Sequence, residues 1–161
     1  RLELVLAYPL RRRDAVLAKA AAIAGEIALV CVVGFVALAA LDVIVGLDLD
    51  FAHLAGGMLG VALLGLLYGW LALAIGAAWP SKVLALGVPA AYAAAAYLVG
   101  GLHDLAGWLD PLRFLSPFWL VGQAPLQNGV DGWGALTVAI AAGLVLAGGA
   151  WLVGRRDLEL P

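Results

Sequence analysis

The chain has 161 residues, of which 65% are apolar and 12% are charged, and its formal net charge is −2. Its mean hydropathy is +1.06. A soluble domain carries about 25% charged residues, and a chain of this length cannot enclose so much apolar surface in an interior of its own. These values exclude an ordinary soluble globule and predict an all-α, polytopic membrane protein.

Long stretches without charged residues indicate the membrane-spanning helices. No Asp, Glu, Lys or Arg lies between Asp50 and Lys82 or between Asp131 and Arg155. A bilayer core about 30 Å thick is crossed by roughly 20 helical residues, so each stretch is long enough to span it. With two further apolar runs, they predict a single transmembrane domain over residues 1–161, with four spans at roughly residues 20–41, 54–79, 83–102 and 133–154.

The segment before the first span, residues 1–19, is basic and amphipathic. Leu2 and Leu6 share one face at helical spacing, and Glu3 lies in the first turn. Pro9 is expected to end this short helix, because proline disfavours helical geometry in the residue before it. Arginines follow at once, so we predict an amphipathic helix at the cytoplasmic edge of the membrane. The chain begins with Arg and has no signal-peptide pattern, which favours a piece excised from a longer chain.

Glu26 is the one carboxylate well inside a predicted span. It follows Lys19 by two helical turns, hence on the same face and about 10 Å deeper at 1.5 Å per residue. An unpaired carboxylate in lipid costs on the order of 3 kcal/mol. Two interpretations stay open: a polar element of a translocation path or of an interhelical contact, and a carboxylate close enough to the interface to pair with Lys19 or an arginine.

Glycines at four-residue spacing in the second span predict close helix packing. Gly56 with Gly60, and Gly65 with Gly69, form two pairs of small residues. In lipid, such pairs let helix backbones approach closely and gain van der Waals contact. The alternative is a composition that is simply rich in glycine and alanine. Neither interpretation identifies the partner helix.

The predicted external loop, residues 103–132, is too apolar to lie free in water. It carries aromatic side chains of the kind that gather at a bilayer surface, namely Trp108, Phe114, Phe118 and Trp119. Apolar residues also surround Ser116 and Pro117. Two arrangements stay open: a short broken helix that re-enters the membrane packed on protein, and an interfacial helix that lies flat.

The distribution of cations predicts the orientation. With four spans, eight of the nine Lys and Arg residues lie on one side, and Arg113 lies on the other. By the positive-inside rule, the cation-rich side is the cytoplasm, so both ends of the chain are expected there. The eight residues are Arg1, Arg11, Arg12, Arg13, Lys19, Lys82, Arg155 and Arg156.

The sequence carries no motif for catalysis or for a cofactor. Neither Lys19 nor Lys82 has the neighbours of a Walker A loop, so ATP-driven work would need a separate subunit. Ser116 lacks the G-x-S-x-G context of a nucleophile elbow. Cys31, the single cysteine, is expected to be a small buried hydrophobe. We therefore expect a non-catalytic protein without cofactor or metal, and with no nucleic-acid partner.

Polar residues of the predicted external side could be imagined as a metal or hydrolase site. They are His53, His103, Asp104 and Asp110. No pair of histidines has the spacing H-x-x-x-H or H-E-x-x-H that a helix needs to hold zinc. The polarity of a surface loop is the expected explanation, and an intramembrane enzyme would need these side chains to converge.

Four motifs resemble segments of ABC-2 type transporter permeases. Residues 2–12, LELVLAYPLRR, resemble the family's LE-x-L-L-x-x-P-[VL]-x-R stretch, and Lys19 is similar to the GK that opens its third helix, with Ala18 in place of the glycine. FLSPF at 114–118 is similar to LSPF of the last external loop, and RRDL at 155–158 resembles the RRD that closes the final helix. The family has six helices, and this chain resembles the last four.

The resemblance implies a permease subunit of an ATP-driven exporter in the plasma membrane. Its implied partners are a cytosolic ATPase subunit, a second permease copy and the lipid bilayer. The implied coupling helix touches the ATPase through residues of the opening segment, namely Leu2, Glu3, Leu6, Pro9, Arg11 and Arg12. The implied external motif is Ser116, Pro117 and Phe118. The alternative is a non-transporting scaffold or anchor, in which Glu26 could be replaced without effect.

Overall fold

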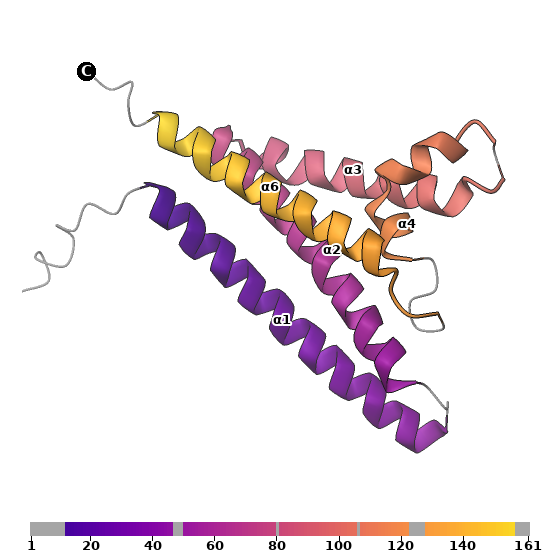
Figure 1. The fold of residues 1–161 in the computed structure, drawn as a ribbon. Helices are drawn as coiled ribbons and strands as arrows, with labels where there is room; N and C mark the ends of the chain where they lie inside the picture. Colours follow the sequence, from indigo (N-terminus) through magenta and orange to yellow (C-terminus); the bar gives the residue numbers. More distant parts are fainter. Residues whose placement is uncertain (1–11, 47–49, 80, 106, 123–127, 157–161) are drawn as a thin grey trace, which may run out of the picture.

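The computed structural model describes residues 12–46, 50–79, 81–105, 107–122 and 128–156. Within these ranges the regular elements are all helical (Figure 1): α1 (Arg12–Val45), α2 (Phe51–Ala78), α3 (Lys82–Leu102), the 3-10 helix η1 (Asp110–Leu115), α4 (Pro117–Val121) and α6 (Gly132–Arg156). Helices α1, α2, α3 and α6 are long and apolar enough to cross a membrane. The all-α architecture with four candidate spans is thereby confirmed, whereas the amphipathic helix expected near Leu2–Pro9 lies outside the described residues.

Helix α1 differs from its prediction at both ends, because it begins at Arg12 rather than at residue 20 and runs to Val45 rather than to residue 41. The predicted cytoplasmic segment 1–19 therefore contributes its last residues to this helix. Asp14 in the first turn favours the helix through the dipole, and long basic side chains near a helix end can keep their charges in water. The 34 residues rise about 51 Å, well beyond a bilayer core of about 30 Å.

The other spans begin and end close to their predicted limits, the largest difference being Phe51 against residue 54. An Asp50 carboxylate oxygen accepts a hydrogen bond from the Ala52 N–H at 2.8 Å and caps the start of α2. Helix α2 ends before Trp79, whose backbone is extended, as expected for a residue that precedes proline. Local capping thus fixes ends that hydropathy alone locates only approximately.

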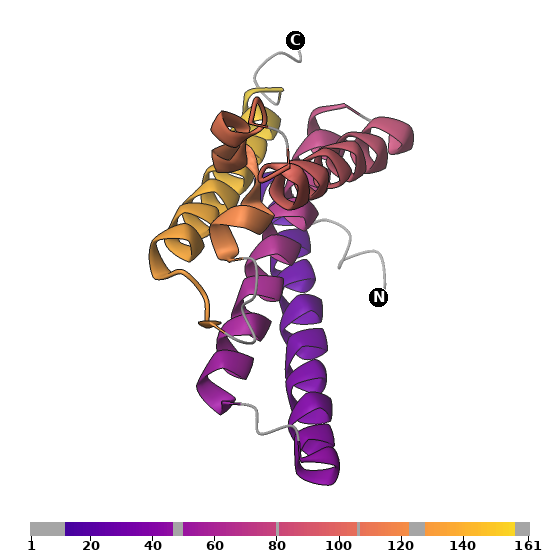
Figure 2. The same cartoon turned by 90° about the vertical axis from the view of Figure 1, so that its right-hand side faces the viewer.

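Helix α2 is the central element, since it packs against α1, α3 and α6. Figure 2 shows α1 and α2 side by side over much of their length. A Cβ added at Gly65 would lie 3.3 Å from Cδ1 of Ile27, and one added at Gly69 would lie 3.0 Å from Cγ2 of Ile23. The predicted close packing is therefore confirmed, and the partner of this glycine pair is α1. Trp70 adds a hydrogen bond from its indole N–H to a carbonyl of α1.

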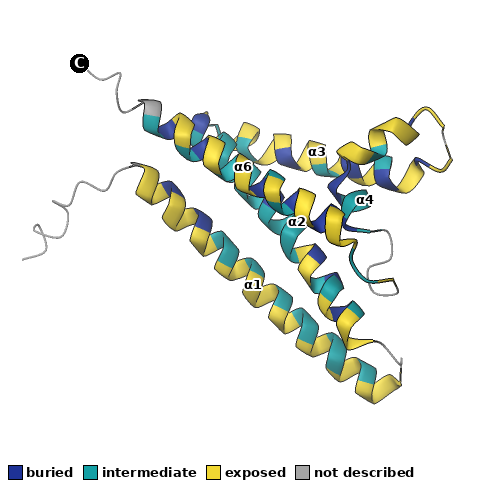
Figure 3. Cartoon of the chain, viewed as in Figure 1, coloured by how far each residue is buried: buried dark blue, intermediate teal, exposed yellow. Residues whose placement is uncertain are grey.

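The core lies between α2, α4 and α6. Leu67, Val121, Val138 and Ala142 are buried together there. In contrast, the most apolar part of α1 contains no buried residue, and Figure 3 shows α1 mainly as exposed and intermediate surface. Exposure of such an apolar face to water is unfavourable, so in a membrane it contacts lipid or another protein segment.

Candidate functional site

The chain turns sharply at Ser116, where η1 ends and α4 begins. We call residues Leu115–Phe118 the Ser116 corner. The Ser116 side chain is 0% exposed. Its hydroxyl donates to the carbonyl of Ala96 in α3 at 2.7 Å and accepts from the N–H of Trp119 at 3.3 Å. One side chain therefore caps α4 and fastens it to α3.

One face of α3 receives the Ser116 corner. Tyr92, Ala96 and Gly100 follow one another at four-residue spacing on this face. The Tyr92 hydroxyl donates to the carbonyl of Leu115 at 2.9 Å. A Cβ added at Gly100 would lie 2.8 Å from Oγ of Ser116, so a side chain there would displace the serine. The corner is thus held by two hydrogen bonds, and the absence of a side chain at Gly100 leaves room for the Ser116 hydroxyl.

Helices α2 and α6 enclose the other sides of α4. A Cβ added at Gly60 in α2 would lie 2.5 Å from Cγ1 of Val121. Gly134 in α6 approaches the backbone carbonyl of Leu120 so closely that an added Cβ would collide with it. The carboxylate of Asp131 accepts from the Gly134 N–H at 3.0 Å and caps the same helix end. Glycines in both helices therefore make room for the short helix.

Ser116 contacts α3, and α4 contacts α2, at positions well inside the ends of these two candidate spans. Ala96 precedes the end of α3 at Leu102 by six residues, or about 9 Å, and Gly60 follows the start of α2 at Phe51 by nine residues, or about 13 Å. Irregular backbone at membrane depth is tolerated where protein surrounds it. This depth favours the re-entrant arrangement of residues 103–132 over the flat one, and re-entry stays a prediction.

An aromatic cluster extends from the Ser116 corner into the helix bundle. The Phe118 ring lies 5.9 Å from that of Tyr68 and 5.7 Å edge-on from that of Tyr97, centroid to centroid. Tyr68 also contacts Tyr92, with ring centroids 5.8 Å apart. The Tyr68 hydroxyl is buried and has no hydrogen-bond partner among the described residues. Phe118 therefore joins α2 and α3 through aromatic contacts.

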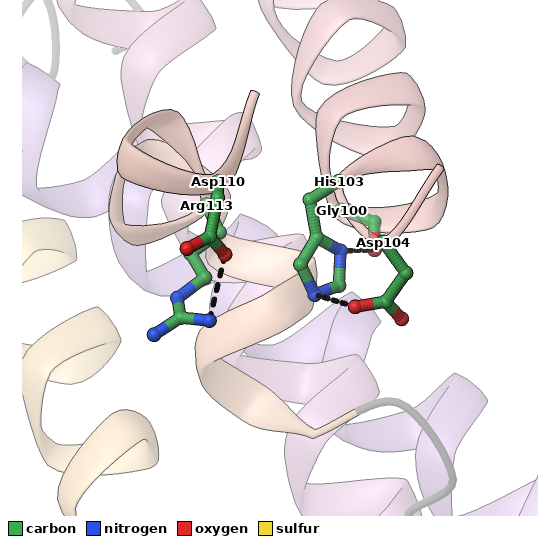
Figure 4. A network of polar contacts seen from close by, with 5 residues as sticks. All are labelled: Gly100, His103, Asp104, Asp110 and Arg113. Carbon is green, nitrogen blue, oxygen red and sulfur yellow. Dashed lines mark hydrogen bonds and ion pairs between the residues drawn. The ribbon is translucent and has the colours of Figure 1, made fainter. Parts of the chain in front are cut away.

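A polar network lies at the end of α3 (Figure 4). His103 is only 5% exposed, with Nδ1 3.0 Å from the carbonyl of Gly100 and Nε2 3.2 Å from a carboxylate oxygen of Asp104. Both neighbours are acceptors, so a neutral imidazole can hydrogen-bond to one of them only. Arg113 donates to Asp110 at 2.8 Å, and its guanidinium lies 4.9 Å from the ring centroid of Trp119. The two pairs lie on different elements (Figure 4).

A cavity of about 430 Å³ lies between α2, α3 and α4, beside this network. Its described lining combines glycines with aromatic and aliphatic side chains, and it has one charged residue, Asp104. The lining includes Gly60, Val61, Tyr97, Gly101, Phe118 and Trp119. A volume of this size accommodates a small organic molecule.

The structure places the predicted site residues in different regions. Ser116 and Pro117 are buried and Phe118 is half-buried, whereas Glu26 is exposed on α1. No ion pair between Glu26 and Lys19 occurs in the described ranges. Leu2, Glu3, Leu6, Pro9 and Arg11 lie outside the described residues, as does the side chain of Arg12. The described His, Cys, Asp and Glu residues form no group of three or more that could hold a metal ion.

Sequence reasoning missed the face of α3 that receives the corner. The only available signal was the four-residue spacing of Tyr92, Ala96 and Gly100, which blends into an alanine-rich span. Nothing in that spacing indicates which segment packs there.

No protein-family model matches the chain, and neither a curated protein nor a solved structure matches it.

Proposed function

We propose that the chain is a membrane-spanning permease subunit of an ATP-driven exporter of the ABC-2 type. The observation that carries the proposal is the break in the chain at the Ser116 corner, after which the short helix α4 packs between α2, α3 and α6 beside a cavity of about 430 Å³. Broken helices at membrane depth are typical of proteins that line a substrate path, whereas a simple anchor does not require one. The four motifs that resemble the permease family support the second part of the proposal, which is coupling to a separate ATPase subunit.

In the proposed assembly, two permease copies pack around a shared path in the plasma membrane. Both ends of the chain lie in the cytoplasm, where the opening segment of Leu2, Glu3, Leu6, Pro9, Arg11 and Arg12 docks a separate ATPase. A short amphipathic helix offers an apolar face that fits a groove of the partner. Movement of the ATPases would then be transmitted to α1, which continues from that segment.

Glu26 fits this assembly because its side chain does not pack against the described part of the chain and is free to contact a second copy or water. The side chain is exposed on α1, although an isolated carboxylate in lipid is unfavourable. We assign it either to the contact with the second permease copy or to the shared path. Both placements give the carboxylate a polar neighbour or water.

The proposal is tested by purifying the full-length protein in mild detergent and identifying co-purified proteins by mass spectrometry. We expect an ATPase subunit with a Walker A motif. Leu6→Asp should reduce its recovery at least fivefold, because a charge on the apolar face opposes docking. Leu4→Asp, a matched change off that face, should retain the ATPase. Recovery of no such ATPase, or equal recovery with both variants, would contradict the proposal.

A further inference from the structure

The cavity beside the Ser116 corner is open at the surface between α2 and α3. Val61 of α2 is 53% exposed and Tyr97 of α3 is 66% exposed, and both line the cavity. Gly60 and Val121, which also line it, are buried. Because both helices are candidate spans, a ligand that partitions into the membrane can approach the cavity from the side.

The cavity persists because its lining is rich in glycine. Gly57, Gly60, Gly100, Gly101 and Gly122 all contribute to it. An added Cβ at Gly101 would meet no heavy atom within 4 Å, so the chain itself leaves this position open. Larger residues at these positions would reduce the space.

The chemistry of the wall favours a cation with an apolar body. Tyr97 and Phe118 contribute aromatic rings, whose faces attract positive charge. The Trp119 ring also lines the cavity, and the Arg113 guanidinium lies 4.9 Å from its centroid. Asp104, the one charged residue of the described lining, is 78% exposed at its side chain. The nearby Arg113 is paired with Asp110, which offsets its charge. An anion would find no cationic partner among the described residues that line the cavity.

We propose that this cavity binds an organic cation with an aromatic or aliphatic body, with the charge near Asp104 and the body against Tyr97, Phe118 and Trp119. A single carboxylate is insufficient for an inorganic divalent cation, which takes several oxygen ligands. The same ammonium chemistry occurs in free lipophilic cations and in choline headgroups of lipids. This binding site goes beyond the proposed function, because binding at equilibrium requires no ATPase.

The test is equilibrium binding of radiolabelled tetraphenylphosphonium to the purified full chain in a non-ionic detergent, with no ATPase present. Triphenylphosphine oxide serves as the uncharged comparator. We expect saturable binding of the cation and at least tenfold weaker binding of the comparator. Competition by phosphatidylcholine would identify a lipid headgroup as the natural source of the cation, and its failure to compete would identify a free organic cation.

Variants locate the site. Gly101→Trp should reduce binding at least tenfold by occupying the cavity, whereas Gly107→Trp, at another open glycine outside the lining, should not. Asp104→Asn should weaken binding about twofold to fivefold, as expected for an exposed ion pair, and Asp104→Glu should restore it. Thermal unfolding checks that each variant is folded. Equal affinity for the uncharged comparator, or unchanged binding by folded Gly101→Trp, would overturn the proposal.

Discussion

One hydroxyl group and one glycine determine how the Ser116 corner packs against α3. Ser116 has no exposed surface, and its hydroxyl makes hydrogen bonds to two different helices. Gly100 leaves the space that this hydroxyl occupies. Loss of either feature weakens the attachment of the corner to α3, where the Tyr92 hydroxyl still donates to the carbonyl of Leu115.

Ser116→Ala should destabilise the protein by about 1–3 kcal/mol, since it leaves the Ala96 carbonyl without this donor and removes the cap of α4. Thr137→Ala is the matched control, because that hydroxyl is exposed and donates only to a carbonyl of its own helix, that of Trp133. SDS titration of both variants in mixed micelles measures the difference. Equal stability of the two variants would show that the Ser116 hydrogen bonds contribute little.

At the scale of the elements, close approaches at glycine determine which helices pack together. Gly65 and Gly69 bring α2 against α1, whereas Gly60 and Gly134 bring α2 and α6 against α4. In lipid there is no hydrophobic force between helices, so such contacts and a few hydrogen bonds provide the attraction. Within α2, Gly65 and Gly69 therefore pack on α1, whereas Gly60 packs on α4.

Gly134→Ala should destabilise the protein by about 3 kcal/mol or more, because its methyl group would collide with the backbone of Leu120, which cannot rotate away. Gly143→Ala in the same helix should be neutral or stabilise by up to about 1 kcal/mol, since its added Cβ meets nothing within 4 Å and alanine favours helix. Unfolding in mixed micelles compares the pair. A mild Gly134→Ala variant would mean that α4 and α6 can separate at little cost.

For the whole molecule, the decisive question is how the four candidate spans thread the membrane. An even number of spans gathers the cations on one face, whereas a miscount by one span would divide them. The positive-inside rule then predicts that the turn before α3 and the start of α1 share the cytoplasmic side.

In a Cys31→Ala background, single cysteines at Asp14 and Lys82 should react with a membrane-impermeant maleimide in inside-out vesicles. A cysteine at Gly107, an exposed position after α3, should react only in right-side-out vesicles. Quantitative mass spectrometry of the labelled protein measures the accessibility. Labelling of Asp14→Cys and Lys82→Cys from opposite sides would contradict the four-span topology.

The sequence alone determined that the chain is helical and that four segments can span a membrane, because hydropathy and charge are local properties summed along each helix. Hydropathy and charge also located the ends of the other three spans to within three residues, whereas the caps at Asp50 and Ser81 became visible only in the structure. Helix α1 extends beyond the predicted span at both ends, since basic residues are compatible with helix beyond the lipid. Only the tertiary structure decided that Ser116 is buried against α3 and that Gly60 and Gly134 receive α4. Those contacts depend on how each helix is rotated and how deep it lies, which spacing along a chain does not specify.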